Sequence, residues 1–203
     1  MTDSFEDFKK YLPQYLSATA QINLFAELEQ FPSNIDSRFY TTKLREEPNI
    51  FQGDGLHSLW ITDLPNDRIA KGRVMVVSNS CDISLENKRL LGPRLIYCPI
   101  ISISKLTTVL KSSNTSEGFD FVGYFDNVRK QRISSMFYLP NVDKLGGEAV
   151  ALLDRMNNCD AQAVDIDAMV NNRLFTLSDY GFYLFLFKLS IHLTRIRERV
   201  ERN

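Results

Sequence analysis

A cysteine beside a carboxylate follows an apolar run in the segment KGRVMVVSNSCDISLENKR, which spans residues 71–89. Cys81 and Asp82 have the residue types of a nucleophile with an acidic neighbour. Because a neighbouring carboxylate disfavours the thiolate, activating Cys81 would require Lys88 or Arg89 to fold over the pair. The sequence offers only two histidines as a base for a catalytic thiol. Three interpretations therefore stay open. The first in order of preference is a buried thiol beside a turn, the second is a binding role for Asp82, and the third is a catalytic thiol.

Small polar and basic residues around this pair form the predicted binding site. The run GRVMVVSN predicts a strand that ends where these polar residues begin. The set consists of Ser78, Asn79, Cys81, Asp82, Lys88, Arg89 and Arg94. Arg68, Lys71 and Arg73 lie in the same part of the chain. If the basic residues share one face, they form a phosphate-attracting surface, and otherwise they are solvated charges.

Metal or cofactor chemistry is not indicated. Asp63, Asp82 and Asp126 fall in three separate predicted loops without the spacing of a metal-binding motif. The segment KLGGEAV has two glycines but lacks the spacing of a phosphate-binding loop. The three cysteines form no C-x-x-C pair, so neither a zinc site nor a disulfide framework is expected. We expect no cofactor and no metal.

The overall charge narrows the possible partners. The 24 basic and 25 acidic residues nearly cancel, so any contact with nucleic acid has to come from a local patch.

The first residues, MTDSFEDFKK, are polar and do not have the pattern of a secretory signal. The longest apolar run, YGFYLFLF, is much shorter than the roughly 20 residues that cross a bilayer. We expect a cytoplasmic protein without membrane contact.

The expected elements begin with helix and continue with short strands. Apolar side chains recur at spacings of three and four over residues 3–30, which predicts helix. The runs HSLWITDLP, GRVMVVSN and PRLIYCPIIS are rich in β-branched and aromatic residues, which predicts strands of a small barrel or sandwich. The segment FVGYFDNVRKQRISSMFYLP is interpreted as a hairpin that turns near Asp126-Asn127. The apolar run in GGEAVALLDRMNN is too short to separate helix from strand.

A long helix is predicted at the end of the chain, from about Tyr180 to Arg199. Ser178 or Asp179 can cap its start, and its cationic second half suits the negative end of the helix dipole. The first half is apolar almost all round and carries five aromatic residues: Tyr180, Phe182, Tyr183, Phe185 and Phe187. These residues either pack on the N-terminal helices or form a subunit interface.

The order of these segments resembles the PemK/MazF family of bacterial toxins, which are ribosome-independent endoribonucleases built on a small SH3-like β-barrel. The match begins with Gly53-Asp54, followed by Trp60 and by Asp63-Leu64-Pro65. The run GRVMVVSN corresponds to a family strand ending Ser-Asn, and CPIIS to one ending Pro-(Ile/Leu)-Thr-Ser. AVALLDRM, NRLFTLSD and the last helix are similar in kind and order. The resemblance covers roughly residues 52–195 and implies that AVALLDRM is a strand.

The resemblance also implies two catalytic candidates, Arg73 and Ser102. Arg73 corresponds to the cation that stabilises the phosphate transition state, and Ser102 would donate to a phosphate oxygen. The sequence departs from the family pattern near both residues. Val74 stands where the family has proline, and Ile101, which has no hydroxyl, stands where it has a catalytic threonine. SNSCDI is not part of the toxin pattern and looks like another bacterial group with a Ser-x-x-Cys-Asp signature.

We therefore expect an α+β protein. A helical extension over residues 1–48 would precede one compact unit, residues 49–203, made of a small, mostly antiparallel SH3-like barrel and a long C-terminal helix. The leading hypothesis is a catalytically degenerate PemK/MazF-like barrel that binds nucleic acid or a protein partner in a prokaryotic toxin or phage-defence-type system. One alternative is an active, metal-independent endoribonuclease acting on single-stranded RNA. Another is an assembly subunit that docks a protein or a second copy through its aromatic C-terminal helix.

Overall fold

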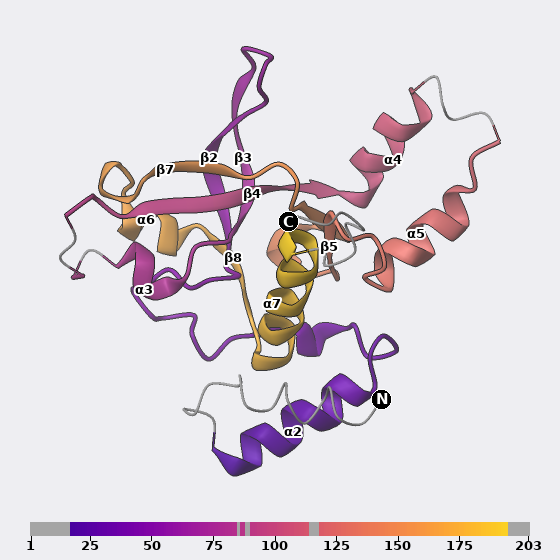
Figure 1. Ribbon diagram of the computed structural model, residues 1–203, viewed down its shortest axis with the longest axis horizontal. Coiled ribbons are helices and arrows are strands. Elements are labelled where there is room, and N and C mark those ends of the chain that lie inside the picture. The colour runs from indigo at the N-terminus through magenta and orange to yellow at the C-terminus, as the bar shows by residue number, and fades with distance from the viewer. Residues whose placement is uncertain (1–16, 85, 88–89, 114–117, 195–203) are drawn as a thin grey trace, which may run out of the picture.

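The computed structural model describes residues 17–84, 86–87, 90–113 and 118–194, which form a mixed α/β fold around one antiparallel sheet (Figure 1). The strands run in the spatial order β1-β8-β2-β3-β4-β6-β5, and β7 pairs with the first half of β4. Their bounds are β1 (Tyr40–Thr41), β2 (Gly55–Thr62), β3 (Ile69–Val76), β4 (Arg94–Ser102), β5 (Met136–Leu139), β6 (Ala149–Leu152), β7 (Asn157–Asp160) and β8 (Arg173–Leu177). Over the described ranges no pairing joins β1 to β5, so the sheet is open there.

Six helices of the described chain accompany this sheet: α2 (Ala18–Glu29), α3 (Ser80–Ile83), α4 (Ile103–Lys111), α5 (Phe121–Arg129), α6 (Ile166–Asn171) and α7 (Asp179–Thr194). Short 3-10 turns are η1 (Ser37–Phe39), η2 (Asp143–Leu145) and η3 (Ala161–Ala163). The Ser178 hydroxyl caps α7 by accepting from the Gly181 N–H at 3.2 Å, as predicted. The predicted helices before residue 17 and after residue 194 lie outside the described residues. None of the described helices is long and apolar enough to cross a membrane.

The three predicted strands around the site are observed as β2, β3 and β4. The run AVALLDRM, which periodicity left open, contains the strand β6. All four residues of β6 are buried. A strand covered on both faces has a continuous apolar sequence, which explains why its pattern did not alternate. The antiparallel sheet and the C-terminal helix of the expected α+β class are thus confirmed.

The predicted hairpin over FVGYFDNVRKQRISSMFYLP is wrong, because its first half forms α5. Asp120 caps this helix, since its Oδ1 accepts from the Gly123 N–H at 2.9 Å. Phe125 and Val128 recur at helical spacing and are buried in one cluster with residues of β5 and β6. The chain reverses after the helix at Gln131, whose backbone is left-handed with φ 57°. Only the end of the segment is a strand, β5.

Helix α4 was not predicted, because its run of β-branched residues has weak helix propensity. Its start is fixed by Ser102, whose hydroxyl accepts from the Lys105 N–H at 3.2 Å. Ile103 and Leu106 are buried in the same cluster as α5. Tertiary packing therefore overrides local propensity at this helix.

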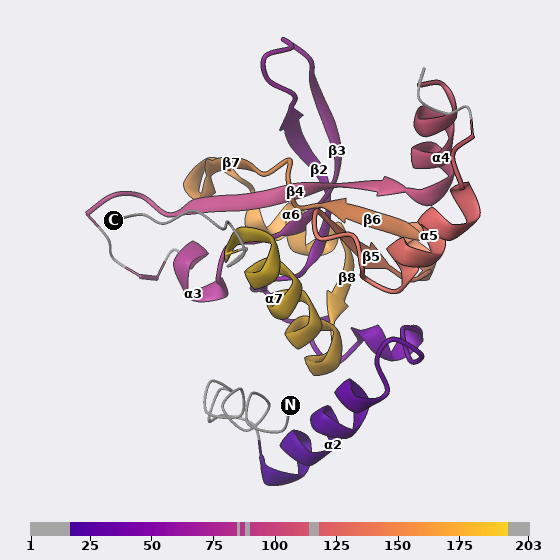
Figure 2. The same cartoon turned by 45° about the vertical axis from the view of Figure 1, so that its right-hand side comes forward.

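Helix α7 covers one face of the sheet (Figures 1 and 2). Tyr180, Tyr183 and Phe185 are at most 4% exposed and belong to one core cluster with Leu24 of α2. Most of the aromatic half of α7 is thus packed inside the protein. Phe187 differs, since it is 51% exposed.

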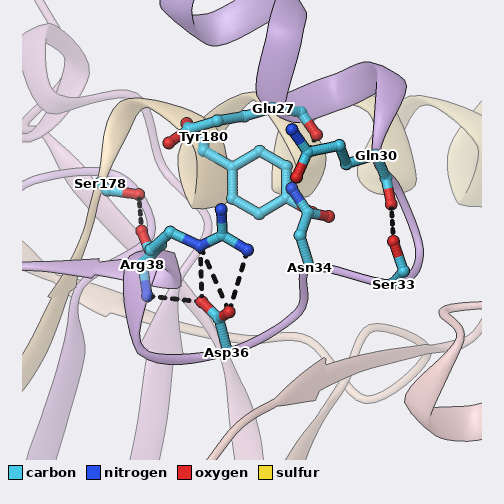
Figure 3. A network of polar contacts seen from close by, with 8 residues as sticks. All are labelled: Glu27, Gln30, Ser33, Asn34, Asp36, Arg38, Ser178 and Tyr180. Carbon is cyan, nitrogen blue, oxygen red and sulfur yellow. Dashed lines mark hydrogen bonds and ion pairs between the residues drawn. The ribbon is translucent and has the colours of Figure 1, made fainter.

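Polar contacts fix the chain between α2 and α7 (Figure 3). The Ser178 hydroxyl donates to the Arg38 carbonyl at 2.6 Å, and the Tyr180 hydroxyl donates to Asn34 Oδ1 at 2.7 Å. The Asn34 amide in turn donates to the Glu27 carbonyl at 2.7 Å. Because β1 also pairs with β8, the expected N-terminal extension contributes a strand to the sheet and packs on α7.

The end of β2 and the start of β3 project beyond the rest of the sheet as a hairpin, here called the arm (Figure 1). The arm carries the single tryptophan of the chain, Trp60, which is 56% exposed. Lys71 is the cross-strand partner of Trp60, and its Nζ lies 4.9 Å from the ring centroid. The arm lies at the start of β3, whereas α3 follows the end of β3, so the two are at opposite ends of this strand.

Candidate binding site around helix α3

Helix α3 is a single turn that follows directly on β3, and side-chain hydrogen bonds fix its start. Asn79 Oδ1 accepts from the Cys81 N–H at 2.9 Å and so caps the turn. The buried Ser78 hydroxyl donates to the Arg94 carbonyl at 3.1 Å and accepts from the Ile96 N–H at 2.6 Å. The predicted binding residues Ser78 and Asn79 therefore determine where α3 leaves the sheet.

Two cavities flank α3. The larger has a volume of about 740 Å³ and lies between residues 49–51, α3 and residues 161–167; we call it the α3 groove. The smaller, of about 500 Å³, is lined by Ser78, Asp82, Leu90, Leu91, Gly92, Pro93, Arg94 and Ile96. Cys81 lines the α3 groove. Lys88 and Arg89, also predicted to bind, lie outside the described residues.

The α3 groove combines a buried apolar floor with an acidic rim. Its fully buried lining residues are Ile50, Ile83, Leu95 and Ala161. They belong to one core cluster, so the floor is the outer surface of the core itself. Its charged lining residues are Glu86, Asp165 and Asp167, all exposed. Across the described part of the chain, no lysine or arginine lines the groove.

A buried ion pair holds the loop that forms one wall of the α3 groove. Arg173 Nε lies 3.2 Å from Asp54 Oδ2, and the two side chains are 5% and 0% exposed. The Nη atoms of Arg173 donate to the carbonyls of Leu44 at 2.6 Å, Glu47 at 3.3 Å and Asn49. One guanidinium therefore fixes the backbone of the loop just before it enters the groove.

Further hydrogen bonds connect this loop to α3. The Phe51 N–H donates to Asp54 Oδ2 at 2.9 Å. Gln52 donates its N–H to Ser80 Oγ at 3.0 Å and its side-chain amide to the Val77 carbonyl at 2.8 Å. Burial raises the pKa of Asp54 to about 6, although the Phe51 N–H and the guanidinium of Arg173 each lower it. Both walls of the groove are thus held in place before anything binds.

The predicted catalytic residues, Arg73 and Ser102, each make structural hydrogen bonds. Arg73 is half-buried on β3, and its Nη1 donates to the Leu145 carbonyl at 2.5 Å. Ser102 caps α4, and its Oγ lies 3.1 Å from Ser104 Oγ. Within the described residues no hydrogen bond joins Arg73 to Ser102, and neither residue lines the α3 groove.

The described basic residues do not gather around α3. Val76 pairs with Tyr97 in the antiparallel ladder of β3 and β4. Lys71 lies five residues before Val76, and Arg94 lies three residues before Tyr97. The two cations therefore diverge from this pair in opposite directions, by roughly 25 Å along extended strands. The ammonium of Lys71 lies over the Trp60 ring within the arm, whereas Arg94 donates through Nε to Asn158 Oδ1 at 3.1 Å.

The three cysteines are free thiols in different surroundings. Cys98 is fully buried, and burial raises its pKa to about 12, so it is inert. Cys159 is half-buried, and burial also raises its pKa. Cys81 is exposed at the α3 groove, without a histidine among the groove residues that the structure describes. In the same part of the chain, no group of histidine, cysteine and acidic side chains could hold a metal ion.

Sequence reasoning did not identify Asp54 with Arg173 as a pair, or the rim residues Asp165 and Asp167. Asp54 and Arg173 lie in segments singled out for the family resemblance, GD and NRLFTLSD, but their sequence separation hid the contact. One signal was available in the sequence: Arg173 stands alone at the start of an apolar strand. Because a buried charge requires a partner, this position predicts an acidic residue near it in the fold.

Comparison of the chain with models of known protein families and with curated proteins finds no match. The PemK/MazF resemblance therefore rests on the motifs quoted from the sequence.

Proposed function

We propose that this protein is a catalytically degenerate relative of the PemK/MazF barrels and that it acts by binding a protein partner. The observation that carries the proposal is the α3 groove, with its apolar floor, acidic rim and fixed walls. Its volume of about 740 Å³ lies within the range of roughly 300–1,000 Å³ that is usual for ligand sites. Carboxylates repel phosphates, so this lining favours a protein over a nucleic acid.

The surroundings of the candidate catalytic residues support a binding role. Arg73 donates to a backbone carbonyl and Ser102 caps a helix, so both have structural reasons to be present. Ile101 stands at the position of the family's threonine and has no hydroxyl to move a proton or to contact phosphate. Cleavage of the kind that the resemblance implies would use both the cation and that hydroxyl.

Two finer features of the proposal come from the resemblance: an SH3-like arrangement of the strands and a role in a prokaryotic toxin or phage-defence-type system. The proposed cytoplasmic location comes from the sequence pattern instead. The antiparallel pairing of β2, β3 and β4, followed by β4 with β6, is compatible with such an arrangement.

Incubation with a long, mixed-sequence single-stranded RNA in EDTA tests the loss of catalysis. We expect intact RNA with the wild-type protein and with Arg73→Ala alike, at high protein concentration. Discrete fragments from the wild type that are absent with Arg73→Ala would establish an endoribonuclease and refute the proposal.

Assembly through α7 is a second candidate function, because three apolar side chains near the end of this helix are exposed. Phe187 and Ile191, four residues apart and therefore on one face of the helix, are 51% and 42% exposed and form the candidate surface, whereas Leu193, 63% exposed, lies on another face. A second copy of the chain is the simplest occupant of such a surface. Sedimentation over increasing protein concentration tests this role, and a monomer at all concentrations would exclude it. A dimer that Phe187→Ser disrupts would support it.

A further inference from the structure

We infer that the α3 groove takes a basic peptide segment with apolar side chains, an inference that rests on the proposed function and specifies its partner. The ligand class follows from two properties of the lining that occur together. The floor is apolar and continuous with the core, and among the lining residues that the structure describes, the charged groups are all acidic. A peptide that alternates lysine or arginine with leucine or valine matches both properties.

The rim supplies the charge complementarity. Glu86 and Asp167 are exposed, and Asp165 uses one carboxylate oxygen, Oδ1, to accept from the Ala168 N–H at 3.0 Å. No hydrogen bond among the described residues uses the second oxygen of Asp165, which can therefore contact a ligand. No lysine or arginine is among the described lining residues. A cation that enters the groove is therefore attracted by the carboxylates of the rim without repulsion from those residues.

The floor supplies apolar contact area. Ile50, Ile83, Leu95 and Ala161 are at most 6% exposed, yet all of them line the cavity. The half-buried Phe51 and Val164 widen this apolar surface. Ligand sites typically combine such a lining with a few polar groups that fix orientation. An apolar side chain between two basic ones would reach this floor, which a bare polyamine cannot do.

The fixed walls lower the cost of binding. Arg173 and Asp54 hold the loop on one side, and Gln52 connects that loop to Ser80 of α3. A groove whose walls are already ordered loses less conformational freedom when a peptide enters.

Fluorescence anisotropy with a labelled peptide of alternating lysine and leucine tests the inference. We expect saturable binding that weakens with salt, and no binding of the matched glutamate–leucine peptide. The double variant Glu86→Gln and Asp167→Asn should weaken binding about three- to tenfold, because two rim carboxylates each contribute modestly. The control Asp63→Asn, at the base of the arm's turn, should bind the peptide like the wild type. Equal binding of both peptides, or equal loss in the control, would overturn the inference.

Alkylation of Cys81 locates the site independently of charge. Because Cys81 is exposed and lines the groove, N-ethylmaleimide at this thiol should block peptide binding. Cys81→Ser, whatever its own affinity for the peptide, should show no further loss of peptide binding on treatment with the reagent, although Cys159 is still present. Full binding by the alkylated wild type would overturn the inference. Failure of the basic peptide together with intact RNA would refute only this choice of partner, whereas RNA cleavage would refute the proposed function.

Discussion

At the scale of single residues, the guanidinium of Arg173 meets one carboxylate and three backbone carbonyls inside the protein. The carboxylate belongs to Asp54, which follows Gly53 in a turn. Gly53 has φ 89°, a conformation that suits glycine and few other residues. The Gly-Asp pair therefore has a structural role here: glycine makes the turn, and aspartate anchors the arginine.

We predict that Arg173→Met destabilises the protein by about 3–5 kcal/mol, because it leaves Asp54 as an unpaired buried charge and the loop carbonyls without donors. Urea unfolding at neutral pH measures the change. Arg38→Met is the matched control, since Arg38 pairs with Asp36 at the surface, where ion pairs contribute little. Equal unfolding midpoints for Arg173→Met and the wild type would show that the buried pair does not hold the loop.

At the scale of elements, β5 ends the sheet and yet is protected from further pairing. The Gln131 side chain donates to the Tyr138 carbonyl at 2.9 Å and accepts from the Tyr138 N–H at 3.0 Å. The side-chain amide of Gln131 thus makes the two hydrogen bonds that a neighbouring strand would make. An edge strand with free backbone groups could otherwise pair with a strand of another molecule. Lys188 of α7 donates to the Gln131 carbonyl, so the helix, the turn and the edge strand are connected.

Gln131→Gly should destabilise the protein by about 2 kcal/mol or more, because two buried backbone groups of Tyr138 lose their partners. Glycine also relieves the strain that glutamine carries at this positive φ, so the measured effect is a lower bound on the contribution of the amide. Gln131→Ala should be less stable by about a further 1 kcal/mol, since alanine is strained at positive φ. Urea unfolding compares the two variants. A glycine variant as stable as the wild type would exclude this role of the amide.

The buried Lys188 of α7 makes the stability of the protein depend on pH. Burial lowers its pKa from the ordinary 10.5 to about 8. Between these pH values the unfolded chain holds the proton more tightly than the folded protein, so stability rises as pH increases from about 8 to about 10.5. Below pH 8 the buried ammonium costs the fold about 3 kcal/mol.

Lys188→Met removes this dependence. The difference in the free energy of unfolding between the variant and the wild type should favour the variant most at pH 7 and should fall by up to about 3 kcal/mol by pH 10.5. Urea unfolding of both proteins at several pH values across this range measures it. A difference that stays constant with pH would mean that Lys188 titrates normally in the folded protein.

At the scale of the whole molecule, the β-branched and aromatic composition of the segments that form β2, β3 and β4 was enough to predict the strands that carry the site. Helix α4 was missed and α5 was misassigned as part of a hairpin. The β-branched and aromatic residues in both segments favour strands locally, and packing on β5 and β6 determines that they form helices. The α3 groove was predicted only on its α3 side. Its loop wall and acidic rim come from residues far away in sequence, and no local pattern joins Arg173 to Leu44.

The central claim is the proposal that this molecule binds a protein partner through the α3 groove in preference to RNA. The most direct measurement titrates the wild-type protein, at one physiological salt concentration, with two labelled ligands: the lysine–leucine peptide and a single-stranded RNA. The account predicts saturable peptide binding that N-ethylmaleimide abolishes, and no RNA binding over the same protein range. Tighter binding of the RNA than of the peptide would contradict it.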